Sequence, residues 1–217
     1  MNIIKDFIPV GRGNRPGRVN PMNYITIHNT GNSSKGANAR SHSNYLKSDS
    51  AVNAQVSWHY TVDDKEIYQH IPDDENAWHC GDGKGDGNSK SIGIEICMNA
   101  DGELLKATDN AVELVVYLCK EHNIPLSNVK QHNNWSGKNC PQMLRCGNPY
   151  DWETFISKVK QGLDAQNELT SVNDLVWELA HRGIISDKDL WLDKLEKDSN
   201  SYWLARKTIK FLKTNGM

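Results

Sequence analysis

Short apolar runs and amphipathic stretches alternate along the first 160 residues of this 217-residue chain. Two runs, Tyr24–His28 and Ser91–Cys97, are almost continuously apolar and rich in isoleucine, which predicts buried strands. Val56–Val62 and Glu66–Ile71 alternate apolar and polar residues and are separated by the polar segment Asp63–Lys65. This arrangement predicts a β-hairpin.

Helical periodicity is clearest over Thr108–His122, where apolar residues recur on one face and Thr108 is the expected N-cap. Ala37–Ser48 and Trp152–Val159 are also predicted as helices. Residues 1–22 are rich in Gly, Arg, Asn and Pro, so an irregular arm is expected there.

Strands that alternate with helices predict an α/β domain over residues 1–160. The polar residues 161–167 are expected to form a linker. Residues 168–217 predict a small domain of three helices, a size near the lower limit for independent stability. Its three amphipathic segments are Ser171–His181, a segment capped by Ser186, and Tyr202–Lys213.

Charge and hydropathy argue against a nucleic-acid-binding protein and against a membrane-spanning protein. The 25 basic and 27 acidic residues give a net charge of −2, so no basic excess is present to meet nucleic-acid phosphates. No apolar run approaches the roughly 20 residues that span a bilayer. The N-terminus lacks the apolar core and cleavage site of a secretory signal. Synthesis in the cytoplasm without a signal peptide, and no membrane insertion, are therefore expected.

Candidate metal ligands occur in two segments about a hundred residues apart. His28 ends the first predicted strand, and His132 and Cys140 lie within nine residues of each other. Two imidazoles and one thiolate suit a zinc ion whose fourth position stays open for chemistry. Either segment alone would be weaker evidence, because a single histidine at a strand end is more often structural. Cys146 is a less favoured further ligand.

The five cysteines are an odd number whose spacing matches neither a disulfide framework nor a paired zinc knuckle. Cys97 and Cys119 lie in apolar stretches and are expected to be buried small hydrophobes.

Two charged residues accompany the candidate ligands. Lys138 precedes Cys140 by two positions, and a cation beside a metal can stabilise the oxyanion of an attacked carbonyl. A solvated loop lysine is the alternative. Glu95 interrupts an apolar strand, where burial would raise its pKa and suit it to accept a proton from water. An edge position facing water is equally compatible with the alternation.

Five segments resemble, in this order, the type 2 N-acetylmuramoyl-L-alanine amidases, which are relatives of the peptidoglycan recognition proteins and include phage and prophage endolysins. The segments are Tyr-Ile-Thr-Ile-His-Asn-Thr, Val-Ser-Trp-His-Tyr-Thr-Val-Asp-Asp, Asn-Ala-Trp-His-Cys-Gly-Asp-Gly, Ser-Ile-Gly-Ile-Glu-Ile-Cys and His-x-x-Trp-Ser-Gly-Lys-x-Cys-Pro. The resemblance covers about residues 20–160 and implies a central mixed β-sheet flanked by helices.

The resemblance also implies the chemistry. His28, His132 and Cys140 would hold zinc, and Glu95 and Lys138 would form the catalytic pair. The implied reaction is hydrolysis of the amide that joins the lactyl group of N-acetylmuramic acid to the L-alanine of the stem peptide, in bacterial peptidoglycan after release of the enzyme.

The position of Trp58 departs from part of the family. Several members have a tyrosine there that lies near the metal, and tryptophan cannot act as an acid or a base, so that role is not carried over and Glu95 is favoured as the base. For His59 and Tyr60, a place in the cleft and a place in the core both stay open, and core packing is favoured for at least one of them. The expected substrate-binding residues are Asn29, Trp58, Trp78 and His79, with the glycine-rich loop Cys80–Asn88 as one wall. For residues 83–88, a flexible surface connection is the equal alternative.

Two alternative functions stay open at this point. A non-catalytic peptidoglycan-binding module of the same fold is disfavoured by Cys140, because such members usually lose the cysteine ligand. A zinc peptidase that cuts within the stem peptide would use the same groups. The predicted third C-terminal helix is basic, and residues 168–217 are expected to bind anionic wall polymers, with dimerisation or a stabilising cap as the alternative.

Overall fold

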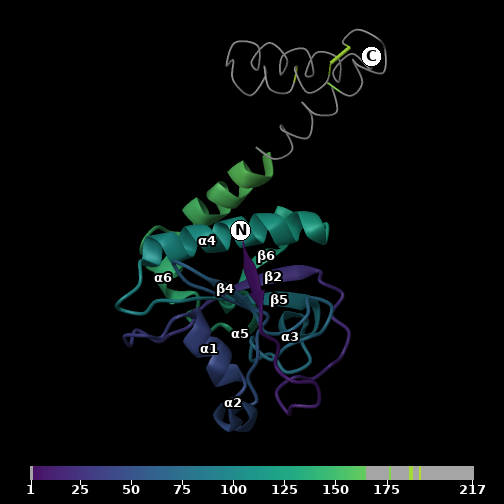
Figure 1. Cartoon of the computed structure of the whole chain (residues 1–217), viewed down its shortest axis with the longest axis vertical. Helices are drawn as coiled ribbons and strands as arrows, with labels where there is room; N and C mark the ends of the chain where they lie inside the picture. The colour runs from purple at the N-terminus through teal and green to yellow at the C-terminus, as the bar shows by residue number, and fades with distance from the viewer. Residues whose placement is uncertain (1, 165–175, 177–185, 188–190, 192–217) are drawn as a thin grey trace. The chain divides into compact units, whose positions relative to one another are not determined.

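The computed structural model of the protein describes residues 2–164, 176, 186–187 and 191 (Figure 1). The chain divides into two compact units, Met1–Lys160 and Gln161–Met217, and the architecture below is that of the first unit. Most of the predicted linker and of the predicted helical domain over 168–217 lies outside the described residues, and both stay predictions.

A six-stranded sheet forms the centre of the first unit, in the strand order β1-β4-β3-β5-β2-β6. The pair β3–β4 is antiparallel and the other neighbouring pairs are parallel. The predicted mixed sheet flanked by helices is therefore confirmed. The strands are β1 (Ile3–Lys5), β2 (Tyr24–Asn29), β3 (Tyr60–Val62), β4 (Ile67–Gln69), β5 (Ser91–Ile96) and β6 (Val129–Gln131).

The two faces of the sheet differ because side chains alternate along each strand. Ile27 of β2 lies beside Ile94 of β5 on one face, where both are fully buried, and His28 lies beside Glu95 on the other. Figure 1 shows α4 (Leu104–Glu121) on one side of the sheet and the helices that follow β2 on the other. The buried face of α4 covers the isoleucine side, and the polar side is left to form a cleft.

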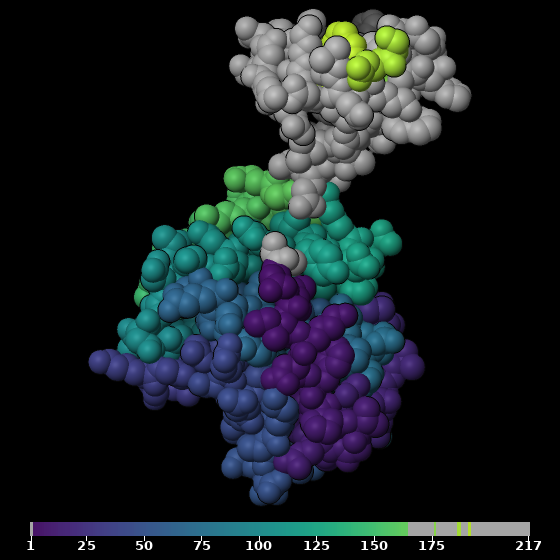
Figure 2. All heavy atoms as spheres, viewed as in Figure 1, coloured from purple at the N-terminus to yellow at the C-terminus, as the bar shows by residue number. Residues whose placement is uncertain are grey.

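Two short strands were missing from the sequence-based prediction. The expected irregular arm contains β1, which pairs with β4 and lies on the surface drawn in purple in Figure 2. The segment that precedes His132 forms β6, which pairs with β2. Their sequences, Ile-Ile-Lys and Val-Lys-Gln, show no alternation of apolar and polar residues, and each strand is defined by its pairing with a neighbour.

The predicted helix over 37–48 is in fact the first of two helices. α1 (Ala39–Leu46) begins at the N-cap Asn38, and α2 (Asp49–Ala54) begins at Ser48, whose side chain accepts a hydrogen bond from the Ala51 amide. Gln55 ends α2 with a positive φ of 52°. Serine therefore starts a new helix where a polar turn was expected.

Other helix boundaries also differ from the prediction. α4 begins four residues before Thr108, whose hydroxyl donates to the Leu104 carbonyl, so the expected N-cap lies inside the helix. The end of the predicted glycine-rich loop is helical. The shorter helices are α3 (Asp86–Lys90), α5 (Asn133–Ser136), α6 (Gln142–Arg145) and a 3-10 turn at Leu126–Asn128.

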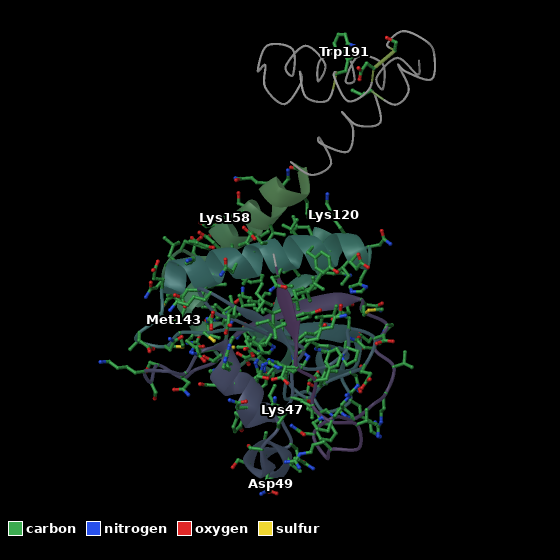
Figure 3. The ribbon with its side chains drawn as sticks, in the orientation of Figure 1. Lys47, Asp49, Lys120, Met143, Lys158 and Trp191 are labelled. Atoms are coloured by element: carbon green, nitrogen blue, oxygen red, sulfur yellow. The ribbon has the colours of Figure 1, made fainter. Side chains whose placement is uncertain are left out.

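A last described helix covers residues 152–164 and confirms the helix predicted from Trp152. Its residues 161–164 fall in the segment predicted as a linker. Lys158, labelled beside α4 in Figure 3, donates to Asp109 of α4, and Tyr150 donates to the same carboxylate. Phe155 and Val159 are buried. In the described part of the chain, no helix has the length and apolarity needed to cross a bilayer.

The core beneath α4 provides a stability test. Leu118→Ala removes a fully buried side chain and is expected to lower the free energy of unfolding by about 2–5 kcal/mol. Leu105→Ala on the same helix removes an exposed side chain and should change it by less than about 0.5 kcal/mol. Urea unfolding followed by circular dichroism measures both. Equal losses would show that α4 does not cover the sheet as described.

Candidate metal centre and cleft

The sheet brings the candidate ligands to the carboxyl end of its central strands. His28 lies near the end of β2, directly beside Glu95 of β5. β6 is the other neighbour of β2, and His132 follows it at once, with its amide donating to the Ile27 carbonyl at 3.2 Å. Parallel pairing therefore places groups from three strands at one point.

The loop from His132 to Cys140 closes on itself through Asn133. Its amide nitrogen donates to the Cys140 carbonyl at 2.9 Å, and its side chain donates to the carbonyls of Gly137 and Lys138. Gly137 allows the tight return with a positive φ of 76°. Residues eight positions apart thus reach the same site.

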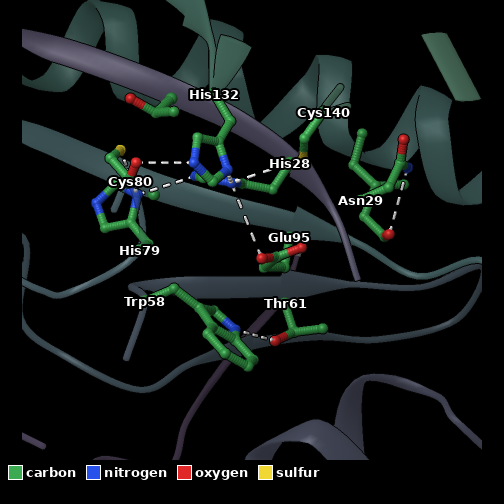
Figure 4. Close-up of polar contacts among 12 residues, drawn as sticks. His28, Asn29, Trp58, Thr61, His79, Cys80, Glu95, His132 and Cys140 are labelled. Atoms are coloured by element: carbon green, nitrogen blue, oxygen red, sulfur yellow. Dashed lines mark hydrogen bonds and ion pairs between the residues drawn. The ribbon is translucent and has the colours of Figure 1, made fainter. Parts of the chain in front are cut away.

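The three predicted ligands converge on one point (Figure 4). His28 Nδ1 lies 3.0 Å from His132 Nδ1 and 3.9 Å from Cys140 Sγ, and all three residues are buried. The second nitrogen of each ring has its own partner: His132 Nε2 donates to the Cys80 carbonyl at 2.8 Å, and His28 Nε2 lies 2.9 Å from His79 Nδ1. Two ring nitrogens and one sulfur therefore face one another, and this donor set fits zinc.

A second group of potential ligands contains His28, His79 and Cys80. It uses the opposite nitrogen of His28, since His79 Nδ1 lies beside Nε2. Cys80 is fully buried, and a Cβ added at Gly87 would lie 2.8 Å from its sulfur. The Cys80 thiol is therefore enclosed, while His79 of this group and His132 of the first group line the same cavity.

Burial sets the protonation of the candidate ligands. It lowers the pKa of His28 well below the usual range and lowers that of His132, so both imidazoles are neutral at pH 7. Burial also raises the pKa of the Cys140 thiol to about 11. The histidines are thus ready to bind a cation, and the cysteine must lose its proton when the ion arrives.

Glu95 faces this group from β5. Its Oε1 lies 3.9 Å from His28 Nδ1, its side chain is 14% exposed, and its buried Oε2 has no hydrogen-bond partner among the described residues. Burial raises the pKa of Glu95 to about 8, against the opposing effect of the positive Lys138. A carboxyl group with a pKa near neutrality is suited to accept and return a proton.

Two cavities meet at Glu95. One, of about 630 Å³, is lined by Trp58, Trp78, His79, His132 and Lys138 among others, and its wall includes Gly81, Gly83 and Asn88 of the predicted loop. The other, of about 400 Å³, is lined by Glu95 and Trp58 together with Thr30, Asn32, Ser41, His42 and Tyr45. The last five were not predicted. They line the cavity from α1 and the loop before it, and of the five only Thr30 lies in one of the quoted segments.

Trp58 lies between the two cavities in a fixed position. Its Nε1 donates to Thr61 Oγ1 at 2.7 Å (Figure 4). The same oxygen lies 2.8 Å from His70 Nε2. Burial lowers the pKa of His70 to about 3, so this contact is made by a neutral ring. Trp58 therefore presents an oriented apolar surface to both cavities.

Four other candidate residues, Asn29, His59, Tyr60 and Cys146, do not line either cavity. The side chain of Asn29, expected at the substrate, is buried and bonds to the Ile96 carbonyl and the Met143 amide. His59 and Tyr60 are buried in the core, where the Tyr60 hydroxyl donates to Asp73. Cys146 is exposed and bonds to the Met143 carbonyl, whereas Cys97 and Cys119 are buried as predicted.

Known proteins match this part of the chain. The profile of the family described as N-acetylmuramoyl-L-alanine amidase (Amidase_2) matches residues 18–143. This chain belongs to that family. The resemblance inferred from the five segments is confirmed.

Two relatives from Bacillus subtilis (strain 168) are similar over most of the first unit. N-acetylmuramoyl-L-alanine amidase XlyA is 58% identical over 162 residues, which are 75% of this chain and 52% of the relative. The amidase CwlH is 52% identical over 160 residues, 73% of this chain and 61% of the relative. The chain therefore spans just over half the length of these curated relatives. The solved catalytic domain of XlyA aligns with a TM-score of 0.69 at 53% identity, over 73% of this chain and 99% of that domain.

The raised pKa of Glu95 makes the stability of the metal-free protein depend on pH. Between the unfolded value of about 4.3 and the folded value of about 8, only the folded state binds this proton, so stability falls as pH rises. Glu95→Gln removes this loss. With a chelator present, the unfolding free energy of the variant minus that of the parent should rise by roughly 1–3 kcal/mol between pH 5 and pH 8.

Denaturant titrations at the two pH values measure this difference. The matched control is Glu113→Gln, an exposed glutamate on α4, which should show no comparable change. The same pH response in both variants would rule out a raised pKa at Glu95.

Proposed function

We propose that this protein is a zinc-dependent N-acetylmuramoyl-L-alanine amidase that hydrolyses the lactyl–L-alanine amide of peptidoglycan. The observation that carries the proposal is the convergence of His28, His132 and Cys140 opposite Glu95, where two cavities meet. Membership of the amidase family and the similarity to XlyA and CwlH support it.

In this proposal, His28 and His132 would hold zinc through Nδ1, and Cys140 would hold it through Sγ. When bound, zinc supplies a Lewis acid that polarises a carbonyl and makes water a better nucleophile. The second-nitrogen partners of the two rings, the Cys80 carbonyl and His79, support this assignment of ligand atoms.

Glu95 and Lys138 perform the proton transfer and charge stabilisation. Glu95 accepts a proton from the attacking water and returns it to the leaving amide nitrogen, so that one water is consumed and one carboxyl and one amine are formed. Its raised pKa allows both steps near neutral pH. Lys138 lines the same cavity and stabilises the negative charge that develops on the carbonyl oxygen.

The shape of the cleft suits a substrate that extends on both sides of the reacting bond. Trp58, Trp78 and His79 offer ring surfaces to the sugar or the peptide, and Glu95 lies at the junction. We infer a role as a phage or prophage endolysin that reaches bacterial peptidoglycan after release from the cell in which it is made. Asn29 is left out of this substrate site because both ends of its amide are bonded to backbone.

The products of digestion distinguish this function from a peptidase. Mass spectrometry of peptidoglycan treated with the protein should show free stem peptides that begin with L-alanine. New termini within the stem peptide would identify a peptidase instead. Binding without any released product would identify a non-catalytic module.

Residues 168–217 are proposed to bind anionic wall polymers through the basic residues of 202–213. Sedimentation with purified cell walls should be stronger for the full chain than for a chain that ends at residue 164. It should weaken as salt rises, because exposed charges are screened. Equal sedimentation of the two chains would contradict wall targeting.

Glu95→Gln keeps the size of the side chain but removes the proton acceptor. The variant should fold and bind zinc, and its kcat should fall by about 10²–10⁴-fold, the usual contribution of a general base. Glu113→Gln is the matched control and should retain full activity. Near-parental turnover in Glu95→Gln would remove Glu95 from the mechanism.

His132→Ala should lose metal and activity together. One of three ligands is removed, along with the hydrogen bond to the Cys80 carbonyl. Zinc content by atomic absorption and amidase turnover measure the two losses, and added zinc should not restore the parental rate. Retention of tightly bound zinc in this variant would show that His132 is not a ligand.

A further inference from the structure

The imidazole of His79 lies against the back of the candidate metal centre. Its Nδ1 is 2.9 Å from His28 Nε2, and the two rings meet edge to face with centroids 5.0 Å apart (Figure 4). Cys80 Sγ lies 3.1 Å from the same nitrogen. His79 therefore touches the candidate ligand His28 on the side opposite to Cys140.

Gly93 of β5 makes room for this ring. A Cβ built at Gly93 would lie 2.7–2.8 Å from three atoms of the His79 ring, closer than real Cβ contacts come. Gly93 itself is fixed, because its amide donates to His59 Nδ1 at 2.9 Å and its carbonyl accepts from the His59 amide at 3.1 Å. The His79 ring thus packs directly against the backbone of Gly93, in space that any larger side chain at this position would fill.

The hydrogen bonds restrict which nitrogens carry protons. A carbonyl can only accept, so His132 has its proton on Nε2 toward Cys80 and a lone pair on Nδ1. For Nδ1 of His28 to bind the same cation, the proton of that ring must also lie on Nε2. That proton points at His79 Nδ1, which must then accept it.

We propose that His79, seated on Gly93, is a positioning residue that holds His28 in the Nε2-protonated tautomer and in the orientation needed to bind the metal through Nδ1. This inference rests on the proposed zinc site. His79 does for His28 what the Cys80 carbonyl does for His132, and such outer partners typically strengthen metal binding by 10–100-fold.

Two substitutions separate hydrogen bonding from packing. His79→Leu keeps a side chain of similar size without an acceptor, and it should raise the zinc dissociation constant of the chelator-treated protein about 10–100-fold. His79→Asn places an amide oxygen near the position of Nδ1, and it should restore most of the lost affinity. Competition with a chromophoric chelator measures both constants, and thermal unfolding of the metal-free variants reports any loss of packing.

A double-mutant cycle tests the role of Gly93. Gly93→Ala should weaken zinc binding in the parent protein, because the added methyl group displaces the His79 ring. In the His79→Ala background the methyl group meets empty space, so the same change should have little further effect. Coupling of the two substitutions is the expected result, whereas additive losses would show that Gly93 acts independently of His79.

Other outcomes overturn the inference in distinguishable ways. Parental zinc affinity in His79→Leu, or equal affinity in the Leu and Asn variants, would show that the hydrogen bond does not matter. Two zinc ions in the parent and one in His79→Leu would make His79 a ligand of a second ion with Cys80. Failure of the parent protein to bind zinc would instead overturn the proposed function on which the inference depends.

Discussion

The parallel pairing of β2 with β5 and β6 is the constraint on which the site depends. It sets His28 beside Glu95, and it starts the His132–Cys140 loop at the end of the neighbouring strand. Side chains at paired positions of parallel strands point to the same face, so one register determines which groups meet. A shift of one residue in β5 would replace Glu95 at this point with an isoleucine and leave the cleft without its carboxyl group.

Burial is the common cause of the unusual chemistry at this site. The same low-dielectric surroundings keep the histidines neutral, keep the Cys140 thiol protonated and raise the pKa of Glu95 toward neutrality. A bound cation would stabilise the thiolate of Cys140 and the carboxylate of Glu95, the charged forms that burial disfavours. The positive charge of the exposed Lys138 lowers the pKa of Glu95 and so opposes part of the effect of burial. The candidate ligand Cys140 and Glu95 are therefore electrostatically coupled.

Hydrogen bonds behind the ligands complete the site, and they come from a segment far from any ligand in sequence. The loop that begins at Trp78 supplies His79 to His28 and the carbonyl of Cys80 to His132. The same loop continues as the wall of the larger cavity. One short segment thus contacts two of the candidate ligands and lines the larger of the two cavities.

The sequence by itself determined the elements with long, regular patterns: the isoleucine-rich strands, the hairpin and the long amphipathic helix. It also identified the three converging candidate ligands and Glu95, because their residue types are chemically costly or distinctive where they occur. Only the tertiary structure decided the three-residue strands β1 and β6, which exist through pairing with neighbours, and the inward turn of Asn29 onto the backbone. It also showed that the His79 ring packs against Gly93. The need for glycine at this position can be recognised only when the neighbouring ring is known.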